Sequence, residues 1–178
     1  MTQATEGHAA SSQHPNQALS DRLRKGLTGV TFEVSETSTD LNLTLPATQL
    51  HTLVQTLKER RELQFDLLRN IAGVDYAEEG MALKYQLYSF SHKWTVQITV
   101  ATAAGHPHVP SLTDLYPAAD WHEREAAEMF GFIFDGHPNL VNLLLEADLH
   151  IHPLLKAHPL QKVEILQGIE DGPAGFKF

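Results

Sequence analysis

The chain has 178 residues, a formal net charge of −9 and no cysteine. Its length fits one domain with a tail, and a hydrophobic fraction of 42% is enough to build a core. The acidic charge and the lack of a basic stripe argue against nucleic-acid binding and against direct docking on anionic lipid. The lack of cysteine excludes disulfides, thiol catalysis and iron–sulfur clusters held by thiolates of this chain.

The N-terminal segment, residues 1–17, is polar and lacks the basic start and apolar stretch of a secretory signal. No run approaches the roughly 20 consecutive apolar residues that a membrane helix needs. The protein is therefore expected to stay in the compartment where it is made. Residues 1–15 mix small and polar residues without a period, which predicts a disordered leader.

The first half of the chain predicts two helices and a hairpin. Three leucines at four-residue spacing predict a helix over residues 17–27. Apolar residues alternate over 30–34 and again over 41–45, with turn-forming residues between them, which is typical of a hairpin. Pro46 opens a second helix that should end near Arg60, because apolar residues recur there at the spacing of a surface helix.

The second half predicts the rest of a sheet and one more helix. The run from 63 to 74 satisfies neither period cleanly, and a strand is favoured. Alternating runs over 82–90 and 94–101 surround a short turn and predict a second hairpin. Residues 118–130 predict a helix. The fold class that follows for residues 16–136 is α+β, a small antiparallel or mixed sheet with helices packed on one face.

The helix over 118–130 carries a pattern of charges at helical spacing. Arg124 is four residues from Asp120 and four from Glu128, so one guanidinium could bridge two carboxylates along the helix. Such a network is expected to fix the helix or an interface.

Glu125 shares one face of this helix with Trp121 and Met129. A carboxylate on an apolar face must find a donor or have its pKa raised. Two hypotheses follow, a proton-relay or general-acid residue and a structural ion pair. The second is favoured, because structural networks also perturb pKa values.

Histidine is abundant, with eleven in the chain, and two pairs have H-x-H spacing. Two histidines at that spacing share a face of a strand and could ligate a metal. No carboxylate or cysteine completes a zinc motif around them, so exposed or interface histidines are favoured over a metal site. The two H-x-H pairs are His106 with His108 and His150 with His152.

Nucleotide-binding, zinc-protease and hydrolase motifs do not occur.

The C-terminal segment, residues 137–178, is apolar but is interrupted by prolines. Proline excludes long helices and central strands, so this segment cannot build a core of its own. A long apolar segment without regular structure is expected to bind something. We therefore predict an extended C-terminal arm that lies on the surface of a partner.

Several runs of sequence together resemble one family, the 30-kDa (NuoC/NdhJ-type) subunit of respiratory complex I. They are residues 73–76, 110–116, 119–125, 129–131, 134–138 and 152–160, and the resemblance covers about residues 45–160. The motif and interface residues that it implies are Glu123, Arg124, Glu125, Glu128, Phe130, Gly131, Gly136, His137, Pro138, His152, Pro153 and Lys156.

The resemblance implies a structural subunit of the quinone module in the peripheral arm of NADH:quinone oxidoreductase, which couples electron transfer to proton translocation. No catalytic, cofactor-binding or metal-binding residue is expected in this chain. Quinone and iron–sulfur clusters are expected on partners, namely the large 49-kDa-type (NuoD-like) subunit and an iron–sulfur subunit. The protein would lie on the cytoplasmic side of the energy-converting membrane and contact that membrane only through the complex.

The chain departs from the family pattern within the C-terminal arm, and this leaves alternatives open. One is the equivalent subunit of a membrane-bound energy-converting hydrogenase. Another is a free-standing histidine-rich metal-binding protein. The departures are Val141 and Asn142 where a basic pair is usual, Glu146 for proline, Leu149 for tryptophan, and Leu155 and Ala157 for the arginine and aspartate that usually flank Lys156.

Overall fold

The computed structural model describes residues 15–27, 30–36, 41–102, 107–146 and 151–157. The predicted leader lies outside these residues except for its last position, where the first helix begins. Residues 147–150 and 158–178 of the predicted C-terminal arm also lie outside them.

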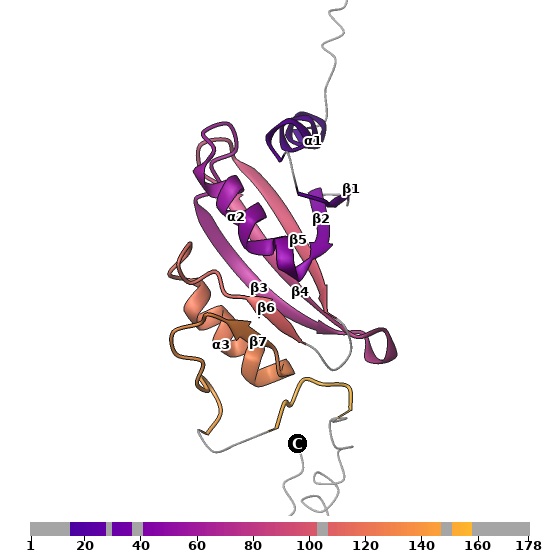
Figure 1. The fold of residues 1–178 in the computed structure, drawn as a ribbon, viewed down its shortest axis with the longest axis vertical. Coiled ribbons are helices and arrows are strands. Elements are labelled where there is room, and N and C mark those ends of the chain that lie inside the picture. The colour runs from indigo at the N-terminus through magenta and orange to yellow at the C-terminus, as the bar shows by residue number, and fades with distance from the viewer. Residues whose placement is uncertain (1–14, 28–29, 37–40, 103–106, 147–150, 158–178) are drawn as a thin grey trace, which may run out of the picture.

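The core of the molecule is a mixed five-stranded sheet (Figure 1). Its strands are β1 (Glu33–Glu36), β2 (Leu41–Pro46), β3 (Leu67–Asp75), β4 (Met81–Ser89) and β5 (Trp94–Thr102), in the spatial order β1-β2-β5-β4-β3. The β2–β5 pair is parallel, and the other three pairs are antiparallel. The prediction of a small mixed sheet in an α+β fold is confirmed.

Both predicted hairpins are present, and the ambiguous run between them has a physical explanation. β1 pairs with β2, and β4 pairs with β5, in the antiparallel sense. The doubtful run contains β3, whose pairing with β4 shifts between Leu68 and Asn70. A bulge adds one residue to a strand and breaks the alternation of its side chains. This is why the sequence satisfied neither period there.

The described residues form three α-helices around the sheet: α1 (Pro15–Gly26), α2 (Leu50–Glu59) and α3 (Ala119–Phe130). A short 3₁₀ turn, η1 (Ala47–Gln49), precedes α2, and a second, η2 (Ala77–Glu79), follows β3. α2 crosses one face of the sheet (Figure 1) and buries all four residues of its predicted stripe. These are Leu50, Leu53, Val54 and Leu57.

The two faces of the sheet differ in chemistry because side chains alternate along each strand. The face beneath α2 carries buried apolar residues such as Leu43, Ile98 and Leu87, and leucines of α1 join the same core. The opposite face is polar and half-buried. On it the Thr99 hydroxyl donates to Asn42 Oδ1 at 2.8 Å.

α3 belongs to a smaller unit at the edge of the sheet, beside β3 (Figure 1). A parallel pair of short strands, β6 (His108–Pro110) and β7 (Ile133–Asp135), flanks this helix. The Tyr116 hydroxyl donates to the Phe65 carbonyl at 2.6 Å and so ties the unit to the body. No helix among the described residues is long and apolar enough to cross a bilayer.

Candidate functional site

The candidate site is the contact between α3 and the start of the C-terminal arm, where most of the motif residues meet. Its innermost group is the carboxylate of Glu123, which is fully buried. One oxygen accepts the Leu112 main-chain N–H at 2.7 Å, and the other accepts the Ser111 hydroxyl at 2.7 Å. Glu123 therefore fixes the segment that leads into α3.

The prediction that Glu125 lies on the buried face of α3 is wrong. Glu125 is exposed, and the Trp121 side chain is 65% exposed. The buried face instead carries Glu123 and Glu128, together with Ala119 and Ala126. The apolar residues of the buried face are only two alanines, which are small. The larger side chains of Trp121 and Met129 therefore predicted the wrong face of the helix as buried.

The surroundings of Glu123 perturb its protonation. Burial raises the pKa of Glu123 to about 7, although the hydrogen bonds from Leu112 and Ser111 act in the opposite direction. The charges of Asp114 and Asp120 raise the pKa further. Both carboxylate oxygens of Glu123 already have donors, so the geometry favours a structural tie over a proton relay.

His137 continues this network from α3 into the arm. Its imidazole is fully buried, and Nε2 lies 3.2 Å from Asp120 Oδ1 and 4.0 Å from Glu123 Oε2. The main-chain N–H of Asn139 donates to Nδ1 at 3.0 Å, so the ring proton sits on Nε2, which donates to the Asp120 main-chain carbonyl at 3.3 Å. The first residues of the arm are thereby attached to α3.

Glu128 holds the next part of the arm by its backbone. This carboxylate is almost fully buried and accepts the main-chain N–H of Leu143 at 2.6 Å and that of Leu144 at 3.0 Å. The N–H of Leu145 approaches one of its oxygens at 3.5 Å. Successive amides that converge on one carboxylate form strong, charge-assisted hydrogen bonds.

The predicted bridge from Arg124 to two carboxylates is wrong. Arg124 donates from Nε to the Val141 carbonyl at 2.9 Å and from an Nη to the Asn142 carbonyl at 3.0 Å. No ion pair joins Arg124 to Asp120 or Glu128, all three of which the structure describes. Asp120 is occupied by His137 and Glu128 by amides, so the guanidinium turns to the carbonyls of the arm.

A second stretch of the arm, residues 151–157, lies across the end of α3. The His152 ring donates from Nδ1 to the Glu128 carbonyl at 2.8 Å, and the Leu154 N–H donates to the Met129 carbonyl at 3.1 Å. These carbonyls belong to the last turn of a helix, where no partner exists within the helix itself. The stretch thus completes the C-terminal end of α3.

Two glycines allow this close packing. Gly131 ends α3 with a φ of 81°, and a Cβ there would lie 2.9 Å from the His152 ring. A Cβ on Gly73 of β3 would lie 2.4 Å from the Phe130 ring. Each glycine therefore admits an aromatic or imidazole ring of a motif residue, and a larger residue would displace it.

Beyond these rings, the Lys156 main-chain N–H donates to Asp75 Oδ2 at 2.8 Å, which links the arm to the end of β3. Sequence reasoning missed individual roles for Ser111 and Asp75, although both fall within the runs that resemble the family. Among the other motif residues, Gly136 forms a turn with a φ of 85°, and Pro138 is exposed.

The arm presents apolar side chains outward while its backbone is held inward. We call five of them the arm strip: Leu140, Val141, Leu144, Ile151 and Leu154, which are 38%, 51%, 64%, 50% and 54% exposed. Exposed apolar residues gathered on one segment mark a site of interaction with another molecule. The boundary of the arm at residue 136 stays a prediction. The contacts nevertheless give its first part a docking place on α3 of the same chain.

Two histidines outside this site pair with carboxylates, whereas His92 stacks on the Trp94 ring. His51 Nε2 lies 2.8 Å from Asp114, and His108 Nδ1 lies 3.0 Å from Asp135. In the part of the chain that the structure describes, no group of three or more His, Cys, Asp or Glu residues is placed to hold a metal ion. His106 and His150, one member of each H-x-H pair, lie outside that part.

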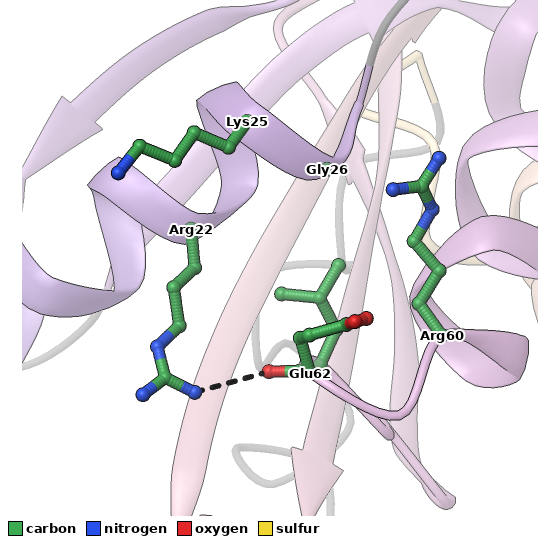
Figure 2. A pocket seen from close by; sticks show the side chains of 6 residues that line it. Arg22, Lys25, Gly26, Arg60 and Glu62 are labelled. Atoms are coloured by element: carbon green, nitrogen blue, oxygen red, sulfur yellow. Dashed lines mark hydrogen bonds between the residues drawn. The ribbon is translucent and has the colours of Figure 1, made fainter.

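A cavity of about 300 Å³ lies at the opposite end of the molecule and is lined by Arg22, Lys25, Gly26, Arg60, Glu62 and Leu63. Figure 2 shows Lys25 and Arg60 extending in different directions. Arg22 donates to the Glu62 carbonyl at 3.4 Å and lies over the Trp94 ring, 4.9 Å from its centroid. The charged groups do not converge on one point, so the cavity is not a candidate anion site.

Comparison with known sequences identifies a family for most of the chain. Residues 43–164 match the family described as respiratory-chain NADH dehydrogenase, 30 Kd subunit. The chain is 36% identical over 143 residues to the C subunit of the NADH-quinone oxidoreductase of Roseiflexus sp. (strain RS-1), an alignment that covers 79% of this chain and 82% of the relative. It is 40% identical over 120 residues to the same subunit of Mycobacterium avium (strain 104), covering 66% of this chain and 51% of the relative.

Another relative is the C subunit of the NADH-quinone oxidoreductase of Salinispora tropica, which is 38% identical over 120 residues. That alignment covers 66% of this chain and 49% of the relative. The chain thus spans about half the length of several curated relatives that it matches.

Two solved structures share the fold. One is the trypsin-resistant fragment of Nqo5, with a TM-score of 0.57, 24% identity, and coverage of 71% of this chain and 99% of that chain. The other comes from the membrane-bound sulfane sulfur reductase, an archaeal respiratory membrane complex. It has a TM-score of 0.72, 18% identity, and coverage of 92% of this chain and 96% of that chain.

Proposed function

Because the chain belongs to the 30-kDa subunit family of respiratory-chain NADH dehydrogenase, we propose that it is a structural and assembly subunit of a complex I-type NADH:quinone oxidoreductase. In this proposal it stands in the quinone module of the peripheral arm and holds no cofactor. The observation that carries the proposal is the arm, whose backbone is fixed by Arg124 and Glu128 while the arm strip faces outward. A subunit whose task is to bind its neighbours needs such a preformed surface.

The partner of the arm strip is the large 49-kDa-type subunit, with an iron–sulfur subunit nearby. Quinone and iron–sulfur clusters lie on these partners, since this chain has no cysteine to hold a cluster. The protein stands on the cytoplasmic side of the energy-converting membrane and touches that membrane only through the complex. Apolar side chains that are about half-exposed in the free chain would be buried on assembly, and burial of apolar area drives association.

The main-chain hydrogen bonds that hold the arm explain why departures from the family pattern are compatible with membership of the family. Val141 and Asn142 stand where a basic pair is usual, but Arg124 binds their main-chain carbonyls. A carbonyl is present whatever the side chain, so the contact survives these substitutions. The Val141 side chain itself is 51% exposed, so this departure changes the outward surface of the arm and would adapt it to its particular partner.

A second candidate is the equivalent subunit of another membrane-bound energy-converting complex, such as a hydrogenase. The likeness in fold to a subunit of the sulfane sulfur reductase complex keeps this candidate open. The large subunit discriminates between the two, because that of a hydrogenase has cysteine ligands for nickel and that of a quinone-reducing complex does not.

The experiment is affinity purification of the tagged chain from detergent-solubilised membranes of its native host. The proposal expects recovery of a 49-kDa-type large subunit without nickel ligands. A charge in the middle of an apolar interface leaves it desolvated and unpaired, so Leu144→Asp should reduce recovery about tenfold or more.

The matched control is Phe90→Asp, which introduces the same charge at a side chain that is 62% exposed in the β4–β5 turn. This variant should recover the large subunit at the wild-type level. The proposal is contradicted if the wild-type chain purifies alone, or if Phe90→Asp reduces recovery as much as Leu144→Asp.

A further inference from the structure

The outer face of α3 carries an exposed carboxylate that forms no ion pair within the described parts of the chain. Glu125 is exposed, and among the described residues no lysine, arginine or histidine pairs with it. The side chain of Arg124, the preceding residue, points away from Glu125 and donates to carbonyls of the arm. The negative charge of Glu125 is thus available to a group from outside this chain.

A cavity of about 250 Å³ opens beside this carboxylate, between α3 and the edge strand β3. Its walls are mostly apolar and include Ile71, Met129 and Phe130, and Leu154 of the arm strip closes one side. The polar groups at the cavity are Glu125 and the exposed amide of Asn70. No hydrogen bond to the Asn70 side chain occurs within the described parts of the chain.

Trp121 lies one helical turn before Glu125, so the two side chains occupy the same face of α3. Its indole is 65% exposed, which is unusual for so large an apolar side chain. A cation is attracted to the face of an indole ring, and tryptophan is the strongest of the aromatic residues in this respect. The helix face therefore offers a carboxylate, an aromatic ring and an apolar slot together.

From this arrangement we propose that the slot receives an arginine side chain of the partner subunit that binds the arm strip. The aliphatic stem of the arginine lies along the apolar walls. Its guanidinium reaches the Glu125 carboxylate and the side-chain amide oxygen of Asn70. Its planar head stacks on Trp121. The inference rests on the proposed function, because Leu154 belongs both to this slot and to the arm strip.

An arginine in the slot would explain two features of this face, the carboxylate without a donor and the exposed tryptophan. Glu125 lies beside apolar side chains, and no hydrogen-bond donor from the described residues reaches its carboxylate. An exposed tryptophan exposes apolar area that assembly would bury. A lysine would satisfy the carboxylate but not stack flat on the indole or reach the Asn70 amide at the same time, which is why arginine is favoured.

The test uses the purified complex bound through the tagged chain and washed with increasing salt. Glu125→Gln keeps the shape of the side chain and removes its charge. It should release the large subunit at lower salt, with about tenfold weaker binding, as the loss of one charge-assisted hydrogen bond predicts. Trp121→Leu keeps an apolar side chain but removes the ring face. It should weaken binding severalfold, since a cation–π contact contributes on the order of 1 kcal/mol.

The matched control is Glu62→Gln, an exposed carboxylate at the far end of the molecule, which should behave like the wild type. The difference between Glu125→Gln and wild type should shrink in high salt, because salt screens ion pairs at a surface; a purely structural role of Glu125 would not show this. If Glu125→Gln retains the large subunit as well as Glu62→Gln does, the inference is overturned while the proposed function stands. If the wild-type chain retains no large subunit, the proposed function itself fails and the inference falls with it.

Discussion

The two halves of this molecule are held together by different physical means. In the sheet half, α1 and α2 bury leucines and valines against alternating apolar residues of the strands. The α3 half joins this core through residues such as Leu112 and Phe132, but its buried carboxylates and one arginine also bind main-chain groups of neighbouring segments. Apolar burial is non-directional and tolerates adjustment, whereas hydrogen bonds to the backbone fix one conformation of the arm. The difference teaches that apolar burial builds the common core, while the polar contacts of the α3 half position a surface.

The largest effect should come from the core of the sheet half. Leu53 of α2 is fully buried, and Leu53→Ala should lower the free energy of unfolding by about 2–5 kcal/mol, from lost burial and the cavity left behind. Urea unfolding followed by circular dichroism measures this change. Gln55→Ala, on the exposed side of the same helix, should lower it by no more than about 0.5 kcal/mol. Equal effects of the two substitutions would contradict the assignment of the core.

The next effect should come from Glu123 and should depend on pH. Its pKa is about 7 in the folded protein against an ordinary value of 4.5, so folding is favoured when Glu123 is protonated. This contribution is present below about pH 4.5 and is lost as the pH rises through 7.

Glu123→Gln removes the titration but keeps the acceptor for Leu112 and a partner for Ser111. The stability of this variant relative to wild type should therefore increase between pH 5 and pH 8, by up to about 3 kcal/mol. Urea unfolding of both proteins at the two pH values provides the comparison. A difference that stays constant with pH would show that the pKa of Glu123 is not raised.

A smaller and local effect is expected from Glu128. Glu128→Gln leaves one oxygen for the amides of Leu143 and Leu144 and replaces the other by a donor. Loss of a charge-assisted hydrogen bond costs about 1.5–3 kcal/mol, so amide exchange over residues 143–145 should become about ten to a hundred times faster. Hydrogen exchange in the strands should stay the same. If exchange rises equally in β4 and β5, the arm and the sheet are not held separately.

The smallest effect is expected at Asp75, which is half-buried at the end of β3. Hydrogen bonds from the main-chain N–H groups of Lys156 and Ala77 lower the pKa of its carboxyl group. The stabilisation from the hydrogen bond between the Lys156 main-chain N–H and the ionised Asp75 carboxylate is therefore present above pH 3.8. It is lost as the pH falls through the lowered pKa of Asp75. Asp75→Asn should speed exchange of the Lys156 amide slightly without changing the melting temperature. Unchanged exchange at Lys156 would show that this contact does not hold the arm.

The sheet half could be predicted from the sequence, because its signals are periodic. The apolar stripe of α2 and the alternation of β2, β4 and β5 follow directly from burial on one face. The one doubtful strand, β3, contains the register shift at Leu68 and Asn70. Where regular geometry is interrupted, periodicity loses its information.

The α3 half could be predicted only in part. The motif residues were identified by resemblance, and the structure brings Glu123, Arg124, Glu128, His137 and His152 to one place. Their partners could not be predicted, since main-chain N–H and carbonyl groups are the same in every sequence. Spacing at four residues suggested an ion-pair ladder because it considers only side chains on one helix.

The central claim is that the arm strip contacts a large partner subunit, and site-specific crosslinking tests it most directly. The chain has no cysteine, so the purified Leu144→Cys variant can be labelled at a single point with a thiol-reactive photocrosslinker before it is assembled into the complex. Phe90→Cys provides the same label at the β4–β5 turn. We expect crosslinks from position 144 to the large subunit and none to it from position 90. Crosslinks to the large subunit from position 90 alone would contradict the claim.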